Sequence, residues 1–346
     1  MIEIGKPGWL DNPRPVCGPL DALVRPTIVA PCSSDTHVMH GGNGPKFNLI
    51  LGHEAVGEVV EVGELVTKFK PGDFVVVPCC TPDWNELGVQ NFKSFSHDVG
   101  MLKSFKFLGA KDGVFGEVFH VNFADANLAP LLEGVSPEAA LLTVDMMSTG
   151  FHGVEQAEIE YGDKVVVIGI GPVGLMAVAG AALAGAGQII AVGTRPNCRK
   201  VATEYGATDL ISYKDGDIVE KVHELTGGGS NKTIIAGGDK TTFTQAVAMT
   251  KEMGIISNVN FFDVTDVLSM PAYLWGLGMA HKDIRGGFCP GGAERIIRMQ
   301  ELIKHGRVDT TKLITHTFKG FDKIEDAFLM MDQKPADLIK PVVYTD

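Results

Sequence analysis

The sequence predicts an α/β protein of two domains, and three observations support this fold class. The chain has 346 residues, which exceeds the size at which a single hydrophobic core usually stops growing. Residues 28–77 alternate short β-branched runs with Gly and Pro, a pattern typical of an all-β region. From residue 164 onward, apolar strand-like runs alternate with helical segments, which indicates a doubly wound parallel sheet.

The first 150 residues are expected to be mainly β. The sequence KPGD at residues 70–73 places Pro and Gly between two strands, where they favour a turn. Residues 79–113 lose periodicity and are predicted to form a long loop or lobe. A helix is expected to begin at Ser136, because Ser suits the N-cap and Pro137 suits the first helical position.

Five apolar strands, beginning with KVVVIGIG at Lys164, are expected to form the sheet of the second domain. Its later helices are expected at residues 196–205, 219–225 and 242–253. Two further helices, at 294–305 and 324–331, and a last strand in IKPVVY are expected to rejoin the first domain. The predicted division is therefore 1–148 with 290–346 for one domain and 149–289 for the other.

Charge and cysteine content exclude several classes of function. The net charge of −12 disfavours binding to nucleic acid or to an anionic membrane surface. Residues 165–194 carry no charge, but glycine breaks divide this run into strand, turn, helix and strand, so we do not expect a transmembrane span. The six cysteines show no CxxC spacing and the N-terminus has no signal-peptide pattern, which predicts a reduced, cytoplasmic protein.

A glycine motif predicts a dinucleotide site. Gly169, Gly171 and Gly174 directly follow a predicted strand and open a helix, with Pro172 and Val173 between the last two glycines. In this context the glycines permit a tight turn, close approach of a pyrophosphate and close packing of the helix on the strand. The alternative is a glycine turn that binds nothing.

The end of the next strand favours NADP over NAD. NAD-binding proteins carry Asp or Glu there, whereas this chain has Gly193, Thr194 and Arg195. A guanidinium can donate two hydrogen bonds to a 2′-phosphate. The alternative is a solvated surface arginine.

Four residues of the first domain offer zinc ligands. Cys32 in APCSSDTH, His53 and Glu54 in LGHEAVGEVVEVG, and Asp145 in LLTVDMMSTG combine a thiolate, an imidazole and carboxylates. Taken singly, Cys32 could be a buried apolar residue and His53-Glu54 a satisfied turn. Together, three protein ligands with an open fourth position would suit a catalytic zinc ion.

The motif GHEAVGEVVEVG, followed by VTKFKPGDFV, resembles the zinc signature of medium-chain alcohol dehydrogenases. The segments TPDW, KDGVFGEVFHVN, DMMSTGFHG, VIGIGPVGLMAVAGA, WGLGMAHK and DLIKPVV further resemble the NADP-dependent secondary alcohol dehydrogenases. The resemblance implies a GroES-like catalytic domain and a Rossmann cofactor domain. It also implies that Cys32, His53 and Asp145 bind one catalytic zinc, with Glu54 as a neighbouring or exchanging ligand.

The same resemblance implies further roles. Ser34 and His37 would relay the alcohol proton, Asp145 would belong to the catalytic set, and Thr149 would contact the nicotinamide. The residues implied to hold the 2′-phosphate end of NADP are Gly193, Thr194, Arg195 and Tyr213.

Two departures from the family pattern concern metal and substrate. The four-cysteine lobe of many medium-chain dehydrogenases is absent from the sequence, so no structural zinc is expected. Phe105 stands where this branch usually has Trp, and Cys79-Cys80 replaces smaller or aliphatic residues. By resemblance, all three residues would line the substrate pocket.

The predicted function is zinc-dependent, NADP-linked interconversion of short secondary alcohols and ketones. Zinc would act as a Lewis acid on the substrate oxygen, while the nicotinamide exchanges a hydride with the carbon. The alternatives are a zinc-free NADPH-dependent quinone or enoyl reductase of the same superfamily, and a catalytically inactive NADPH-binding protein. Relatives imply a homotetramer.

Overall fold

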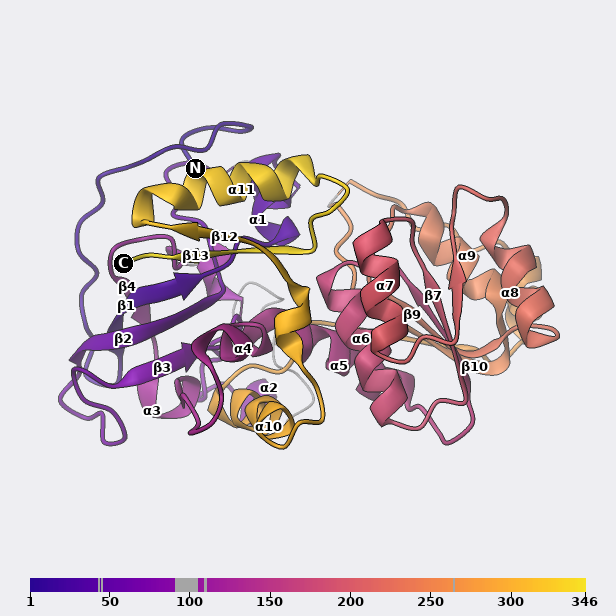
Figure 1. Ribbon diagram of the computed structural model, residues 1–346, viewed down its shortest axis with the longest axis horizontal. Helices are drawn as coiled ribbons and strands as arrows, with labels where there is room; N and C mark the ends of the chain where they lie inside the picture. Colours follow the sequence, from indigo (N-terminus) through magenta and orange to yellow (C-terminus); the bar gives the residue numbers. More distant parts are fainter. Residues whose placement is uncertain (43, 45, 91–104, 109–110, 264) are drawn as a thin grey trace. The chain divides into compact units, whose positions relative to one another are not determined.

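The computed structural model describes residues 1–42, 44, 46–90, 105–108, 111–263 and 265–346. The chain divides into two compact units (Figure 1). Unit 1 comprises Met1–Ser148 and Cys289–Asp346, and unit 2 comprises Thr149–Phe288.

Unit 1 is built on a largely antiparallel sheet. Its strands follow the order β12-β13-β1-β2-β3-β5, and β4 pairs with β1. Val29 on β1 opposes Ala55 on β2 and Val343 on β13. The strands are β1 (Ala22–Val29), β2 (Ala55–Val62), β3 (Phe74–Val77), β4 (Phe119–Val121), β5 (Ala129–Pro130), β12 (Ile314–Lys319) and β13 (Lys340–Tyr344).

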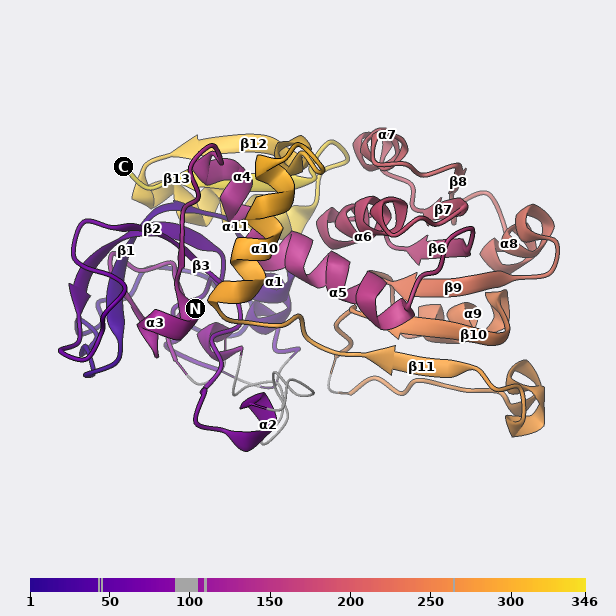
Figure 2. The ribbon, with the colours of Figure 1, turned by 90° about the horizontal axis from the view of Figure 1, so that it is seen from below.

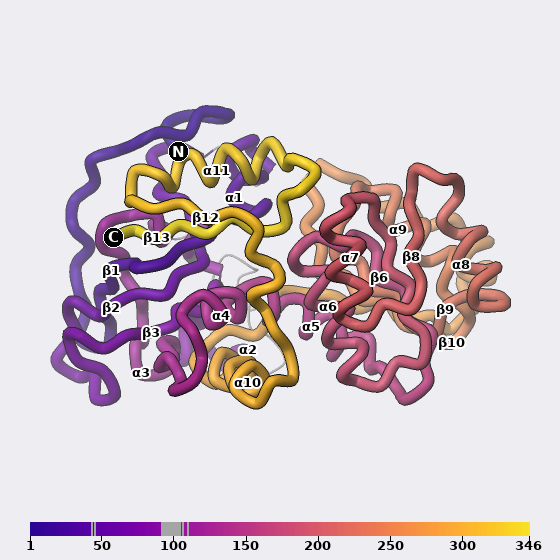
Figure 3. Tube along the Cα trace, viewed as in Figure 1, coloured from indigo at the N-terminus to yellow at the C-terminus, as the bar shows by residue number. Residues whose placement is uncertain are grey.

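The C-terminal segment completes unit 1. In Figure 3 the yellow β13 lies beside the indigo β1, and these strands pair antiparallel. Helix α11 (Ile324–Gln333) packs on β13, and Ile324 and Ala327 join the buried core of the sheet. Helix α10 (Ala293–Lys304) also lies in unit 1.

Short helices connect the strands of unit 1. The α-helices are α1 (Ser33–Met39), α2 (Leu87–Gln90), α3 (Ala124–Asn127) and α4 (Pro137–Leu141). The 3₁₀ helices are η2 (Lys106–Leu108), η5 (Thr310–Leu313) and η6 (Phe321–Lys323). Of the loop predicted at 79–113, residues 91–104 and 109–110 lie outside the described residues.

The helix expected from Ser136 begins as predicted. The Ser136 hydroxyl accepts a hydrogen bond from the Ala139 backbone N–H, and Pro137 occupies the first turn. After α4 the chain widens into a π-helix, η3 (Thr143–Met147), before α5 (Ser148–Ala157). Single π-helical turns often occur at functional sites, and this one carries Asp145.

Unit 2 has the predicted doubly wound parallel sheet. Its strand order is β11-β10-β9-β6-β7-β8. The chain enters the sheet at the central strand β6, adds β7 and β8 on one side, and then adds β9, β10 and β11 on the other side. This is the order of dinucleotide-binding folds, with the switch point between β6 and β9. The strands are β6 (Lys164–Ile168), β7 (Gln188–Val192), β8 (Asp209–Ile211), β9 (Ser230–Ile235), β10 (Thr250–Asn258) and β11 (Asp283–Gly286).

The connecting helices of unit 2 pack on the sheet and on one another. Helix α6 packs on β6 and β7, whereas α9 packs on β9 and β10. The helices are α6 (Pro172–Leu183), α7 (Pro196–Glu204), α8 (Ile218–Thr226), α9 (Thr241–Met249) and the 3₁₀ segment η4 (Ala272–Gly278). The uncharged run 165–194 forms β6, α6 and β7. None of the helices that the structure describes is both long and apolar enough to cross a bilayer.

Two sequence expectations for unit 2 were wrong in detail. The helix expected over 242–253 ends at Met249, because Thr250 is extended and pairs with Ser230. The strand register then shifts between Thr250 and Ile255, and most residues of this irregular stretch are exposed. Their sequence lacks the apolar pattern of a buried strand, which is why the helix was expected to continue through them. A sixth strand, β11, lies at the sheet edge beside β10 (Figure 2); its polar sequence DIRG contains no apolar run.

Candidate metal and nucleotide sites

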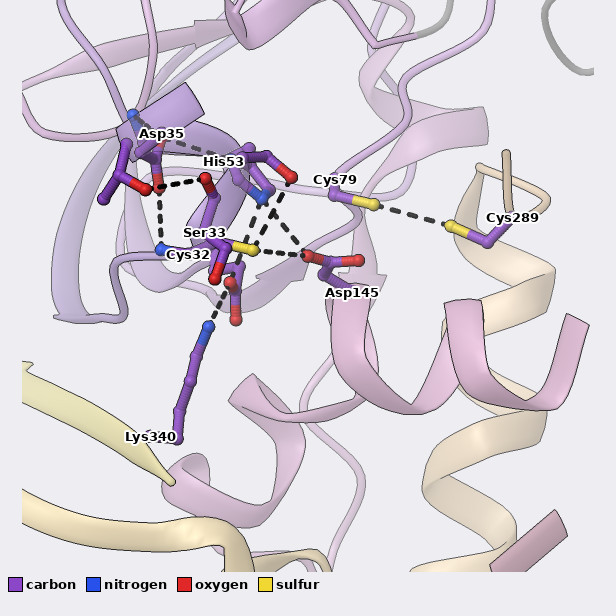
Figure 4. A network of polar contacts seen from close by, with 12 residues as sticks. Cys32, Ser33, Asp35, His53, Cys79, Asp145, Cys289 and Lys340 are labelled. Carbon is purple, nitrogen blue, oxygen red and sulfur yellow. Dashed lines mark hydrogen bonds and ion pairs between the residues drawn. The ribbon is translucent and has the colours of Figure 1, made fainter. Parts of the chain in front are cut away.

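The four predicted zinc ligands converge in unit 1. One donor atom from each of Cys32, His53, Glu54 and Asp145 lies within 4.8 Å of the others, and all four residues are buried. The Cys32 thiol donates to Asp145 Oδ2 at 3.5 Å, and His53 Nε2 lies 3.2 Å from the same oxygen. Figure 4 shows the side chains of Cys32, His53 and Asp145 directed toward one another.

Three segments of the chain supply the four donors, and Asp35 holds two of them in place. Cys32 lies between β1 and α1, His53 and Glu54 come just before β2, and Asp145 lies in η3. Asp35 of α1 accepts hydrogen bonds from the backbone N–H groups of Cys32 at 2.8 Å and Gly52 at 2.9 Å. Its Oδ1 also lies 3.4 Å from His53 Nδ1. Asp35 therefore links the segments that carry the thiol and the imidazole.

Glu54 is held on one side by a lysine. Lys340 Nζ donates to Glu54 Oε1 at 2.5 Å, and both side chains are completely buried. The same Oε1 lies 3.9 Å from His53 Nε2, whereas the buried Oε2 makes no hydrogen bond. Glu54 thus has one oxygen bound to Lys340 and another available to a cation.

The metal-free cluster favours protons on its ligands. Burial raises the pKa of Cys32, and it raises the pKa of Glu54 to about 7 against the opposing effect of Lys340. Burial lowers the pKa of His53, but the Asp35 charge and hydrogen bonding with Asp145 outweigh it and raise that pKa well above the usual value. A bound cation would displace these protons and compensate the buried acidic groups.

The donor set fits zinc. Zinc accepts thiolate, imidazole and carboxylate ligands, and three protein ligands leave a position for substrate. The second nitrogen of His53 faces a carboxylate, as is usual for metal-binding imidazoles. The buried Oε2 of Glu54, which makes no hydrogen bond, offers the cluster a further oxygen ligand.

The predicted proton-relay residues both lie in α1. Ser34 Oγ is 3.7 Å from Cys32 Sγ, and Ser34 and His37 are spaced i, i+3, so they share a helix face. Thr149 is the first residue of unit 2 and lies in α5.

The three residues predicted to line the substrate pocket are buried near the metal cluster. The Phe105 ring meets the His53 ring edge-on, with centroids 4.9 Å apart. The Cys79 backbone N–H donates to the Val144 carbonyl, next to Asp145. Cys80 directly follows and is also buried.

The glycine loop of unit 2 has the expected shape. Gly169 has φ +86°, which favours glycine, and a Cβ at this position would overlap the Gly237 backbone. A Cβ at Gly174 would overlap the Gly169 carbonyl oxygen, so close packing of α6 on β6 requires glycine there. Pro172 begins α6, whose N-terminal N–H groups and dipole suit a pyrophosphate.

The residues predicted for the 2′-phosphate end lie at the ends of β7 and β8. The Thr194 hydroxyl donates to Tyr213 Oη at 3.0 Å. A Cβ at Gly171 would lie 3.6 Å from Arg195 Nη2, so the guanidinium lies over the glycine loop. A Cβ at Gly193 would overlap the Ile170 side chain, which explains the small residue at this position.

Sequence reasoning missed three residues around the metal cluster. Asp35 lies within the quoted motif APCSSDTH, but its role depends on backbone groups of a distant segment. Lys340 could have been noticed as a single charge in an apolar strand, which usually requires a buried partner. Cys289 meets Cys79 across 210 positions, and no spacing rule reveals this pair.

Comparisons with known proteins agree with this geometry. Residues 18–131 match the family model "Alcohol dehydrogenase GroES-like domain", and residues 172–305 match "Zinc-binding dehydrogenase". The NADP-dependent isopropanol dehydrogenase of Thermoanaerobacter brockii is 56% identical, over 99% of this chain and 98% of its own length. That of Clostridium beijerinckii is 55% identical over the same shares.

Solved structures show the same fold. A zinc-dependent alcohol dehydrogenase from Streptococcus pneumonia, in its apo form, superposes with a TM-score of 0.88 at 26% identity, covering 100% of this chain and 98% of the other. An alcohol dehydrogenase from Thermus sp. ATN1 gives a TM-score of 0.82 at 27% identity, with coverage of 98% and 96%.

Proposed function

This chain belongs to the zinc-binding alcohol dehydrogenase family, and we propose that it interconverts short secondary alcohols and ketones with NADP(H). The observation that carries the proposal is the buried convergence of Cys32, His53 and Asp145, with Glu54 beside them. Relatives that match this chain over nearly its whole length are named NADP-dependent isopropanol dehydrogenases. Unit 1 would provide the metal centre and unit 2 the cofactor site. The predicted domain bounds, 1–148 with 290–346 and 149–289, differ from the two units in the place of Cys289, which belongs to unit 1.

The reaction oxidises a secondary alcohol to a ketone and reduces NADP⁺ to NADPH, with release of one proton. Cys32, His53 and Asp145 would hold a zinc ion, which when bound supplies Lewis-acid polarisation of the substrate oxygen. The chain's own residues bind and orient the substrate and accept its proton. Glu54, held by Lys340, would balance the charge beside the ligands.

Ser34 and His37 would move the hydroxyl proton. A hydroxyl both accepts and donates, so the Ser34 Oγ can take the proton and pass it on. The ring nitrogens of an imidazole can accept and donate a proton, so the partly exposed His37 can pass the proton toward solvent. Thr149 would contact the nicotinamide.

The preference for NADP would come from residues after β7 and β8. Thr194, Arg195 and Tyr213 offer two hydroxyls and a permanent positive charge to a 2′-phosphate. Gly193 adds no side chain at this end of β7, where a Cβ would overlap the Ile170 side chain. Gly169, Gly171, Pro172, Val173 and Gly174 would receive the pyrophosphate.

The substrate would be small. Cys79, Cys80 and Phe105 are the pocket residues proposed here, and the Phe105 ring already packs against His53. A homotetrameric assembly and a cytoplasmic location, both expected from the sequence, stay predictions.

The proposal is tested by mixing the purified protein with 2-propanol and NADP⁺ and following the absorbance of NADPH. We expect turnover with NADP⁺, much weaker turnover with NAD⁺, and loss of activity after chelation of the metal. Replacing Cys32 or Asp145 by Ala should abolish turnover while NADPH still binds. Undiminished reduction of ketones or quinones by metal-free protein would instead favour the zinc-free reductase, and NADPH binding without any turnover would favour the inactive protein.

A further inference from the structure

We propose that Cys79, Cys80 and Cys289 form a second metal site, specific for thiophilic ions such as Zn²⁺ or Cd²⁺. The three thiols, called here the thiol cluster, belong to unit 1 and share no ligand with the cluster around Cys32. Cys79 and Cys80 follow β3, whereas Cys289 lies shortly before α10. Figure 4 shows the sulfur atoms of Cys79 and Cys289 facing each other.

The sulfur separations match those of thiolates around one ion. Cys79 Sγ lies 3.6 Å from Cys289 Sγ and 3.9 Å from Cys80 Sγ, and all three sulfurs lie within 4.8 Å of one another. With zinc–sulfur bonds of about 2.3 Å and tetrahedral angles, two thiolates on one zinc ion are separated by about 3.8 Å. Little movement is therefore needed to close the three thiols around an ion.

Backbone contacts hold the thiol cluster in this arrangement. The Gly292 N–H donates to the Cys80 carbonyl oxygen at 3.2 Å, and the Cys79 N–H donates to the Val144 carbonyl at 3.3 Å. A Cβ at Gly291 would overlap the Cys80 carbonyl. The Pro-Gly-Gly segment after Cys289 therefore lies in close contact with the Cys79-Cys80 segment.

The ligand type selects the ion. Thiolates favour soft or borderline ions with filled d shells over Mg²⁺ or Ca²⁺. A metal binds the thiolate form, so binding of one divalent ion by the three thiols releases their three protons and leaves three thiolates on the metal.

Occupation of the thiol cluster should inhibit the proposed reaction, a consequence that rests on the proposed function. Cys79 is hydrogen-bonded to Val144, the neighbour of Asp145, and its side chain is one of those proposed to meet the substrate. An ion held there would take up pocket volume beside the catalytic ligands. Binding of the ion itself does not depend on turnover.

The experiment titrates Cd²⁺ into the zinc-loaded full-length protein under reducing conditions and records the thiolate-to-cadmium absorption band. We expect a Cd²⁺ equivalent bound without release of the original zinc, and a loss of activity that follows its binding. Cys289→Ala should lose both this band and the inhibition, and Cys80→Ala should lose the band. Cys198→Ala, which removes a buried cysteine of unit 2, should behave as wild type.

Thermal unfolding checks that each variant is folded before the titration. The proposal is overturned if wild type shows no band, if Cys289→Ala binds the same Cd²⁺ with the same band, or if the band appears only as zinc is released. These outcomes are separate from the proposed activity, because 2-propanol oxidation is measured in cadmium-free samples. An inactive protein that still shows the band would contradict the proposed function alone.

Discussion

Asp35 is fully buried and accepts hydrogen bonds from the backbone of two segments that carry proposed zinc ligands, those of Cys32 and His53. Its carboxylate also faces Nδ1 of His53. Carboxylates that face the second nitrogen of a metal-binding imidazole fix its orientation and increase its basicity. Asp35 thus positions two ligands without binding the metal itself.

Replacing Asp35 by Asn should weaken zinc binding. The amide keeps the shape of the side chain but removes the negative charge beside His53, and we expect zinc affinity to fall by about 10- to 100-fold. Competition with a chromophoric chelator measures this affinity. Asp332→Asn, which changes a carboxylate paired with His40 at the surface, is the matched control, and an equal loss of affinity in both variants would refute the role of Asp35.

The Glu54–Lys340 pair should stabilise the fold only while both partners are present. Both side chains are completely buried, so Lys340→Met leaves a buried carboxyl without its partner and should cost about 3 kcal/mol of unfolding free energy. Urea unfolding measures the change. Adding Glu54→Gln to Lys340→Met should recover part of the loss; if the double variant is less stable than Lys340→Met, this explanation is wrong.

Single residues also mark where sequence reasoning reaches its limit. Cys32, His53 and Asp145 could be proposed because each lies in a recognisable local motif. Asp35 and Cys289 could not, because their partners lie on segments distant in sequence and are brought near by the fold. Lys340 stands out in the sequence as a single charge in an apolar strand, but its partner Glu54 is also distant in sequence. The roles proposed for Ser34, His37 and Thr149 stay predictions.

The elements of unit 2 were largely predictable, because parallel strands buried on both faces give continuous apolar runs. The exceptions have physical reasons. Strand β11 is a polar edge strand, and β10 starts with an irregular, exposed stretch after Thr250. The π-helix at Asp145 was not predicted, since its sequence differs little from that of an α-helix.

Two glycines of the loop before α6 should respond differently to alanine. A Cβ at Gly174 would overlap the Gly169 carbonyl, so Gly174→Ala should destabilise unit 2 and weaken NADPH binding together. A Cβ at Gly171 meets only Arg195, at ordinary contact distance, and the backbone there has φ −71°. Gly171→Ala should therefore fold normally but bind NADPH at least about tenfold more weakly, because the methyl group occupies the place of the pyrophosphate.

Thermal unfolding and NADPH fluorescence titration separate the two effects. Normal NADPH affinity in a stable Gly171→Ala protein would argue against pyrophosphate binding at this loop.

For the whole molecule, the division into two units separates the proposed metal ligands from the proposed cofactor contacts. The proposed zinc ligands all belong to unit 1, and the proposed NADP contacts from Gly169 to Tyr213 all belong to unit 2. Removal of zinc is therefore expected to abolish turnover while leaving NADPH binding nearly unchanged.

Acid should weaken the metal centre. In the metal-free protein the pKa values of Cys32 and His53 are raised, so protons compete with zinc for both ligands. Zinc affinity should fall as the pH is lowered and rise as it is increased, and activity after dilution should follow the same direction.

The most direct measurement is the return of 2-propanol oxidation as zinc is added back to chelator-treated protein, using Cys289→Ala so that the thiol cluster takes up no ion. We predict that activity rises in proportion to added zinc and levels off at one ion per chain, and that Asp145→Ala stays inactive throughout. Full activity before any zinc is added, or an Asp145→Ala protein that recovers like the parent, would contradict the account.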